Sequence, residues 1–137
     1  MYENEIPEIL KNSKSVAIIG LSRDPTRDSY KVASFLQSKG YRVIPVNPEA
    51  ARAGEQILGE KAYRDLFSVP ERVDIVDVFT TQEKLESIVQ DAVVKGAKVL
   101  WTQIGIIDNE AEALAQRYGI KVVMNRCIML EHRNLGL

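Results

Sequence analysis

The stretch Ser15–Leu36, SVAIIGLSRDPTRDSYKVASFL, decides how this chain folds. It opens with an apolar run typical of a buried strand, and Gly20 follows that run directly. A polar loop containing Arg23, Pro25 and Arg27 then leads into a segment with apolar residues at helical spacing. Strand, glycine turn and helix in this order are typical of the phosphate loop of a nucleotide-binding protein, although the G-x-G-x-x-G triplet is missing.

The same alternation of short apolar runs and helical segments continues along the chain. Most of the runs are rich in Val and Ile and almost continuously apolar, which is typical of strands buried on both faces of a parallel sheet. The predicted strands are Val16–Ile19, Arg42–Val46, Val73–Phe79, Lys98–Trp101 and Lys121–Met124.

Helices are predicted between these strands and near both ends. The main ones are Asp28–Lys39, Thr81–Lys95 and Asn109–Tyr118, with a brief helix near Tyr63–Phe67 and short helices at Ile6–Lys11 and Ile128–Arg133 packing on the sheet edges. Alternating strands and helices joined by right-handed crossovers give a doubly wound fold. We therefore expect one domain over residues 1–137: a Rossmann-like, five-stranded parallel sheet in a three-layer α/β/α arrangement.

The composition narrows the possible functions. The formal net charge is −1 over 137 residues and no long basic run is present, which argues against binding to nucleic acid or to an anionic membrane. The apolar runs are too short to span a membrane, and the N-terminus has no apolar signal core. With one cysteine and one histidine, an internal disulfide is excluded and a Cys/His metal site is not expected. These features predict a cytoplasmic protein.

In a doubly wound sheet, ligands bind beyond the carboxyl ends of the strands. The residues there are mostly neutral hydroxyls and amides, without a carboxylate pair or a nucleophile beside a base. Proton transfer needs a titratable group, whereas ligand binding needs fixed donors and acceptors. The pattern therefore predicts binding rather than catalysis. The residues that follow the five strands are Gly20, Leu21 and Ser22; Asn47 and Pro48; Thr80 and Thr81; Thr102, Gln103, Ile104 and Gly105; and Asn125 and Arg126.

The loop after the first strand has the chemistry of an anion site. Gly20 permits close approach of the backbone, and the start of the next helix offers free N–H groups. Ser22 and Ser29 supply hydroxyls, and Arg23 and Arg27 can add charge-assisted hydrogen bonds. The alternative is an ordinary polar loop with solvated arginines.

The end of the second strand bears on which nucleotide fits. NAD-binding folds usually carry an acid there for the ribose hydroxyls. This chain has Asn47 and Pro48, with Glu49 only afterwards. A dinucleotide redox cofactor is therefore disfavoured.

Four further side chains have a structural interpretation to set beside any functional one. Cys127 can be a thiol activated at a helix start, but a small buried core residue is the expected role. His132 is expected to be solvated near the C-terminus, and Trp101 to pack in the core. Tyr30 either faces the ligand or covers the helix start.

Several linked stretches carry a family resemblance. They are VAIIGLSRDPTRDSYKV, GYRVIPVNP, VDIVDVF, GAKVLWTQIGI and VVMNRCIMLEHRNL. In this order and at these spacings, the chain resembles the small CoA-binding domain proteins from about Ile6 to Leu135. These are stand-alone relatives of the N-terminal domain of the succinyl-CoA synthetase α subunit.

The resemblance implies a Rossmann-like fold with coenzyme A, or an acyl-CoA, lying over the strand ends. The pyrophosphate would face the loop after the first strand and the start of the next helix. The adenosine would lie near the end of the second strand, and the pantetheine arm near the end of the fourth strand. The residues implied in binding are Gly20, Leu21, Ser22, Arg23, Pro25, Arg27, Ser29, Tyr30, Asn47, Pro48, Phe79, Thr80, Gln103, Gly105, Asn125 and Arg126.

Two positions depart from the family pattern. Relatives commonly have Arg where this chain has Thr80, and Asp where it has Asn125. The first change removes a possible phosphate partner, and the second removes a charge. The synthetase's catalytic phosphohistidine lies outside the matching domain, and nothing here replaces it.

We therefore expect a non-catalytic protein that binds CoA or an acyl-CoA and that can serve a partner enzyme. The alternatives are an NAD(P)- or nucleotide-dependent enzyme of the same fold, and an interaction module without a ligand.

Overall fold

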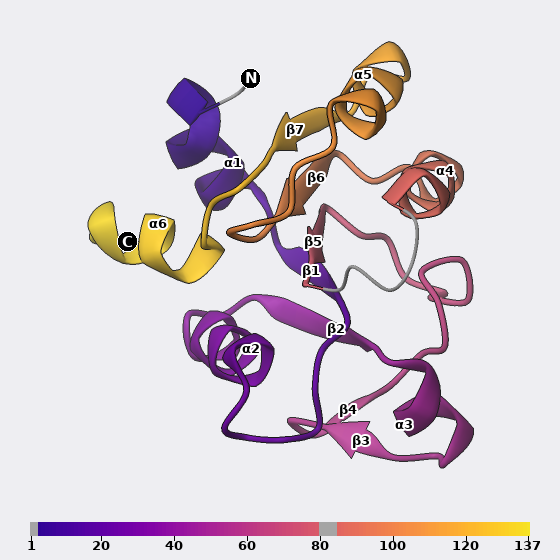
Figure 1. The fold of residues 1–137 in the computed structure, drawn as a ribbon. Helices are drawn as coiled ribbons and strands as arrows, with labels where there is room; N and C mark the ends of the chain where they lie inside the picture. The colour runs from indigo at the N-terminus through magenta and orange to yellow at the C-terminus, as the bar shows by residue number, and fades with distance from the viewer. Residues whose placement is uncertain (1–2, 80–84) are drawn as a thin grey trace.

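The computed structural model describes residues 3–79 and 85–137, and within them the chain forms one five-stranded parallel sheet. The order across the sheet is β2-β1-β5-β6-β7 (Figure 1). The predicted Rossmann-like α/β fold is confirmed. The strands are β1 (Ser15–Ile19), β2 (Arg42–Val46), β5 (Ile75–Val78), β6 (Val99–Thr102) and β7 (Lys121–Val123).

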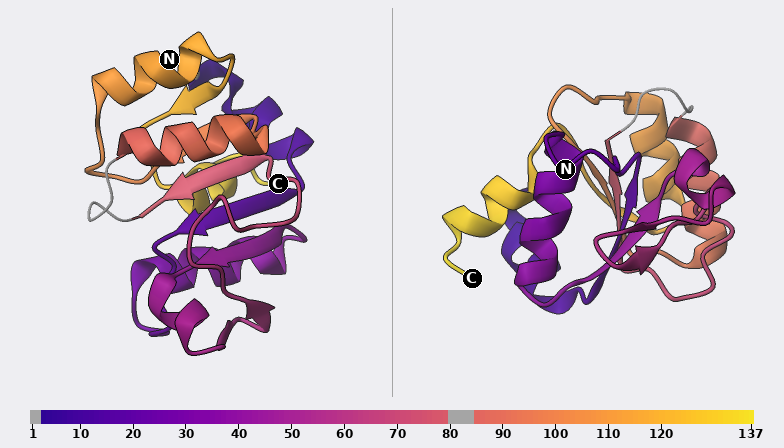
Figure 2. Two further views of the ribbon diagram at one scale, coloured as in Figure 1. Left: turned by 90° about the vertical axis from the view of Figure 1, so that its right-hand side faces the viewer. Right: turned by 90° about the horizontal axis from the view of Figure 1, so that it is seen from below.

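Helices cover both faces of the sheet, as the alternating pattern predicts (Figure 2). One layer contains α1 (Ile6–Asn12), α2 (Asp28–Ser38) and α6 (Ile128–Asn134). The other contains α4 (Leu85–Lys95) and α5 (Asn109–Arg117). A short 3-10 turn, Glu3–Glu5, precedes α1. No helix of the described residues is long and apolar enough to cross a membrane.

The strand order places a topological switch point between β1 and β5. From β1 the chain passes through α2 to β2 on one side, whereas from β5 it passes through α4 and α5 to β6 and β7 on the other. The loops after β1 and β5 therefore leave the sheet in opposite directions. This divergence opens the crevice in which ligands of doubly wound sheets bind.

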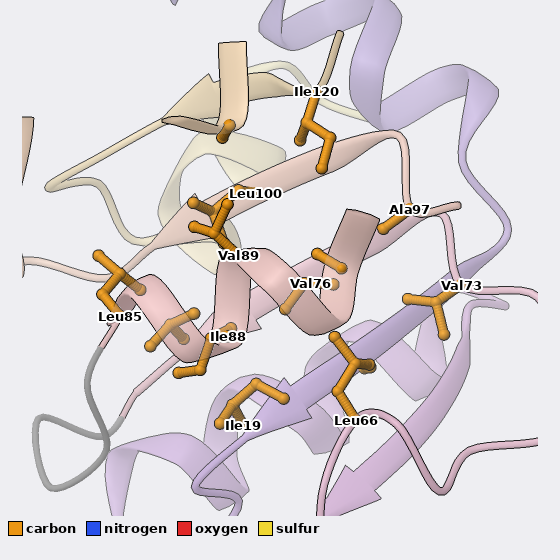
Figure 3. Packing of buried hydrophobic residues seen from close by; sticks show 14 of the residues in the cluster. Ile19, Leu66, Val73, Val76, Leu85, Ile88, Val89, Ala97, Leu100 and Ile120 are labelled. Atoms are coloured by element: carbon orange, nitrogen blue, oxygen red, sulfur yellow. The ribbon is translucent and has the colours of Figure 1, made fainter. Parts of the chain in front are cut away.

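Buried side chains alternate between the two faces of each strand. In β1, Val16 and Ile18 pack in the cluster beneath α2, whereas Ala17 and Ile19 pack in the cluster beneath α4. Ile88 of α4 belongs to this second cluster, which Figure 3 shows from close by. Burial of both faces explains why the strand sequences are continuously apolar instead of alternating.

The segment between β2 and β5 differs from the prediction. The prediction of a helix near Tyr63–Phe67 is wrong. Tyr63 forms an isolated parallel bridge with Val46, and Asp65 accepts hydrogen bonds from the N–H and hydroxyl of Ser68. Three elements in this segment were not predicted: α3 (Pro48–Arg52) and the hairpin of β3 (Gln56–Ile57) and β4 (Glu60–Lys61).

The terminal helices and His132 lie in different places from those that the sequence predicts. Helices α1 and α6 pack on the face of the sheet that α2 covers, with Leu10 and Ile128 fully buried, and not on its edges. His132 is 3% exposed, and its ring lies edge-on to Phe35 and Tyr41 with centroids 5.4 and 5.7 Å away. Burial, aided by the charge of Lys39, lowers the pKa of His132.

Candidate functional site

The loop after β1 begins with a turn that only glycine adopts without strain. Gly20 has a φ of 88°, and its N–H donates to the carbonyl of Val46 at 2.9 Å. This hydrogen bond extends the pairing of β1 with β2 by one residue. The loop therefore leaves from a fixed point at the carboxyl end of the sheet.

Two serines then hold the loop against the first turn of α2. The N–H of Ser22 donates to Oγ of Ser29 at 2.9 Å, and Ser29 is buried. Oγ of Ser22 accepts from the N–H of Asp24 at 3.0 Å. Hydrogen bonds from the N–H and hydroxyl of Thr26 to Asp24 lower the pKa of that carboxyl. The loop is thus shaped by its own side chains beside the N-terminus of α2.

The two arginines of the loop have different surroundings. Arg23 forms ion pairs with Glu49 at 3.1 Å and Glu55 at 2.7 Å, which tie it to the segment after β2. Arg27 is exposed at the N-cap of α2 and forms no ion pair within residues 3–79 and 85–137. Asp28 follows it as the first residue of α2 and does not cap the helix. Arg27 is therefore the cation of the loop that remains available to an anion.

Leu21 and Asn47 connect the loop to the end of β2. Leu21 is fully buried, so it supplies no atom to the surface of the loop. Its carbonyl accepts a hydrogen bond from Nδ2 of Asn47 at 2.9 Å. Oδ1 of Asn47 caps α3 by accepting from the N–H groups of Glu49 and Ala50, each at 3.0 Å. Both ends of the Asn47 side-chain amide, its Nδ2 and its Oδ1, are therefore engaged in hydrogen bonds within the protein.

A cavity of about 550 Å³ lies beside this loop, within the size range of small-molecule sites. It is bounded by the start of α2, the end of β5, the loop after β6 and the start of α6. Most of its lining is apolar, and Lys31 supplies a cation. The lining residues are Asp28, Lys31, Val32, Phe79, Gln103, Ile104, Gly105, Ile106, Cys127, Met129 and Leu130.

Side-chain hydrogen bonds fix one wall of the cavity. The N–H of Gly105 donates to Oδ1 of Asn125 at 2.8 Å, and the N–H of Asn125 donates to Oγ1 of Thr102 at 3.2 Å. Asn125 has a φ of 60°, in the left-handed region that asparagine tolerates. Oε1 of Gln103 accepts from the N–H of Ile128 at 3.3 Å. Asn125, which stands where relatives commonly have Asp, therefore still supplies a side-chain oxygen that accepts a hydrogen bond from Gly105.

Trp101, Arg126 and Cys127 lie near the start of α6. Trp101 is fully buried, as predicted, and its Nε1 donates to the carbonyl of Arg126 at 2.8 Å. The Arg126 guanidinium lies 3.6 Å from a Glu131 oxygen. Cys127 is not the fully buried core residue that the sequence suggests: it is half-buried and its side chain belongs to the cavity lining.

A second hollow of about 480 Å³ lies between α2 and α6. It shares Lys31 and Met129 with the first cavity, so the two are adjacent. Pro25 and Tyr30 line this second hollow, and neither lines the cavity of Phe79 and Gln103. The full lining is Pro25, Tyr30, Lys31, Ser34, Phe35, Ser38, Met129 and Arg133.

The predicted residues thus fall into separate groups. Phe79, Gln103 and Gly105 line the cavity, and Gly105 is held by Asn125. Pro48 is exposed at the start of α3 and, like Asn47, lines neither hollow. Thr80 lies outside the described residues.

One carboxyl group near the site was not singled out from the sequence. Asp77 in β5 is fully buried, and neither of its oxygens has a hydrogen-bond partner within the described residues. Burial raises the pKa of this carboxyl well above its usual value. The signal was present, because Asp77 interrupts the apolar run VDIVDVF. Among the described residues, no group of three acidic, histidine or cysteine side chains is placed to hold a metal ion.

Comparisons with known proteins show which family the chain resembles. Residues 14–133 match the model of the CoA-binding domain family. An uncharacterized protein of Bacillus subtilis, YneT, is 38% identical over 128 residues, which are 93% of this chain and 92% of that protein. An ADP-forming acetate–CoA ligase of Methanocaldococcus jannaschii is 26% identical over 133 residues, covering 90% of this chain but only 18% of the ligase.

Solved structures show the same fold. A protein of Thermus thermophilus, cell-free ID.343, superposes with a TM-score of 0.90 at 36% identity and covers 98% of this chain and 99% of that one. A hypothetical protein of Pyrococcus horikoshii superposes with a TM-score of 0.91 at 36% identity, covering 100% and 94%. The resemblance drawn from the sequence is confirmed: the chain belongs to the CoA-binding domain family.

Proposed function

We propose that this protein binds coenzyme A or an acyl-CoA and does not itself catalyse a reaction. The observation that carries the proposal is the contact between two chemically different half-sites. The loop held by Ser22 and Ser29 brings Arg27 to the start of α2, where the first N–H groups of the helix have no partner within the helix. The mainly apolar cavity begins at the same helix, because Asp28 and Lys31 line it.

This pair of half-sites suits the two parts of CoA. A diphosphate binds well at the N-terminus of a helix, where N–H groups are free and the dipole is positive. The pantetheine arm is long and uncharged, with methyl and methylene groups that can pack in a cavity walled by Phe79, Ile106 and Met129. The family membership supports the same ligand.

Binding without catalysis is supported by the titratable groups around the cavity. Among the described residues those in its lining are Asp28, Lys31 and Cys127. General acid–base catalysis needs a group with a pKa tuned near the working pH and within reach of the reacting atom. The pKa of Asp77 is raised, but this residue is fully buried and is not in the cavity lining.

The proposal is tested by native mass spectrometry of the freshly purified protein and by calorimetric titration with CoA, dephospho-CoA and NAD. We expect CoA to bind with a stoichiometry of one and more tightly than NAD. Tighter binding of NAD would favour a dinucleotide enzyme instead. Absence of binding to all three would favour an interaction module.

A further inference from the structure

The cavity contains a thiol that the proposed function does not use. Cys127 is the only cysteine in the sequence, and it is half-buried and unbridged. It lines the same cavity as Phe79 and Met129, which wall the proposed path of the pantetheine arm. An arm that enters this cavity therefore brings its own terminal thiol toward a thiol of the protein.

A second residue of the cavity offers a hydrogen bond that the protein does not use. Gln103 is 7% exposed, and its Oε1 accepts from the N–H of Ile128 at 3.3 Å. Because a backbone N–H can bond only to the oxygen, this contact fixes the orientation of the amide. Nε2 of Gln103 donates to none of the residues that the structure describes. It is not one of the enclosed unpartnered atoms among them either, so it keeps accessible surface and faces the cavity that Gln103 lines.

The donor of Gln103 and the thiol of Cys127 match the end of the pantetheine arm. The arm ends in an amide, two methylene groups and the thiol. The amide carbonyl is an acceptor for Nε2 of Gln103, and the thiol that follows it points onward to Cys127. The bond from Ile128 to Gln103 keeps these two groups close together, since Ile128 directly follows Cys127. Two neighbouring groups of the cavity therefore fit two neighbouring groups of one ligand.

We propose that Cys127 is a modification site that forms a mixed disulfide with CoA, and that Gln103 positions the arm for this step. The inference rests on the proposed function, because the arm of CoA must enter the cavity. The co-reactant is CoA disulfide, the oxidised form of the ligand.

The step is a thiol–disulfide exchange. Cys127 gives its proton to water, and the thiolate attacks one sulfur of CoA disulfide. The sulfur–sulfur bond of the reactant breaks as the bond between Cys127 and CoA forms. The second CoA leaves as a thiolate and takes up a proton. One disulfide replaces another, so no further oxidant is needed, and a reducing thiol later releases the CoA.

The test compares three disulfides that share progressively fewer features with CoA. CoA disulfide carries the nucleotide and the arm, pantethine carries the arm alone, and hydroxyethyl disulfide carries neither. The rate at which each modifies the protein is followed by mass spectrometry of the intact chain, and dithiothreitol shows whether the added mass is held by a disulfide. Using ratios of rates between reagents cancels any change in the general reactivity of the thiol.

Three variants accompany the wild type, each checked for folding by circular dichroism. Cys127→Ser removes the thiol. Gln103→Glu keeps an oxygen for the N–H of Ile128 but loses the N–H donor. Gln116→Glu is the matched control, because it adds the same charge at an exposed position on α5.

We expect the wild type to gain one CoA per chain, reversibly with dithiothreitol, and Cys127→Ser to gain none. The wild type should react at least about tenfold faster with CoA disulfide than with hydroxyethyl disulfide, which is more than a typical single hydrogen bond supplies. Pantethine should lie between them. Gln103→Glu should lose about threefold to tenfold of the preference for pantethine over hydroxyethyl disulfide, the effect of one hydrogen bond. Gln116→Glu should keep that preference, and unfolding in urea should abolish it.

Equal rates with the three disulfides in the folded wild type would overturn the inference, and this comparison decides even where a variant does not fold. An unchanged preference in folded Gln103→Glu, or added mass in Cys127→Ser, would also overturn it. The proposed function is tested separately by titrating the wild type with CoA in dithiothreitol, where no disulfide forms. If CoA binds there but CoA disulfide reacts no faster than hydroxyethyl disulfide, the CoA site stands and only the role of Cys127 is rejected. If CoA does not bind, the proposed function itself fails.

Discussion

The backbone N–H of Ser22 donates a hydrogen bond to the hydroxyl of Ser29, seven residues later, at 2.9 Å. This bond closes the loop between β1 and α2 and fixes it beside the first turn of the helix. Ser29 is buried, so water does not replace its hydroxyl easily. Because the free N–H groups that would hold a diphosphate lie at the start of this helix, the shape of the loop determines whether a ligand can reach them.

Ser29→Ala is expected to lower CoA affinity about tenfold and the free energy of unfolding by about 1 kcal/mol, the contribution of one hydrogen bond. Titration and urea denaturation measure the two effects. Ser87→Ala provides the matched control, since Ser87 is exposed on α4 in the opposite layer. Unchanged affinity in folded Ser29→Ala protein would show that the loop does not hold the ligand.

Arg27→Ala is expected to weaken CoA binding by about tenfold at low ionic strength, because a charge-assisted hydrogen bond to a phosphate is lost. The difference from wild type should shrink as salt is added, since the residue is exposed. Arg117→Ala removes the same charge from an exposed position on α5. An equal loss of affinity in both variants would indicate a general charge effect and no specific contact.

Asn47→Ala is expected to destabilise the protein by about 1–2 kcal/mol, as for other helix N-caps. The variant loses the cap of α3 and also the hydrogen bond to the carbonyl of Leu21. Asn47→Asp keeps the capping oxygen but loses the amide donor to Leu21. It should therefore recover most of the stability in chemical denaturation and still bind CoA more weakly than wild type. Full recovery of both properties would mean that the bond to Leu21 is unimportant.

Asp77→Asn is expected to change the pH dependence of stability. Because the pKa of Asp77 is raised in the folded state, the native protein binds more protons than the unfolded chain above the usual pKa of 3.8. The stability contributed by the neutral acid is complete below that value and is lost as the pH rises through the folded pKa. The asparagine side chain does not titrate.

The unfolding free energy of Asp77→Asn relative to wild type should therefore increase with pH from about pH 4 and level off above the folded pKa. Urea denaturation of both proteins between pH 4 and pH 9 measures this difference. Parallel curves would show that Asp77 titrates normally.

The elements that the sequence predicts well are those set by local patterns. The strand at Arg42–Val46 is predicted with its observed ends. Gly40 shortly before this run and Asn47-Pro48 directly after it both interrupt regular structure, so both ends are marked in the sequence. Asn47 followed by Pro48 is also the signature of a helix start, so α3 could have been predicted from the same residues.

Features that depend on distant contacts could not be predicted. Arg23 pairs with Glu49 and Glu55, which lie 26 and 32 residues away. The loop sequence alone therefore does not show that the charge of Arg23 is already paired. His132 lies near the C-terminus in the sequence, yet it is buried against Phe35 and Tyr41, which lie 97 and 91 residues earlier in the chain. The cavity likewise joins segments from α2, β5, the loop after β6 and α6, which only the folded chain brings together.

The central claim is tested most directly by a crystal structure of the protein soaked with CoA. We expect the diphosphate within hydrogen-bonding distance of N–H groups at the start of α2 and of the loop that Ser22 and Ser29 hold. The pantetheine arm should lie between Phe79 and Gln103 in the cavity. Well-ordered CoA bound elsewhere, or an empty loop and cavity at saturating CoA, would contradict the account.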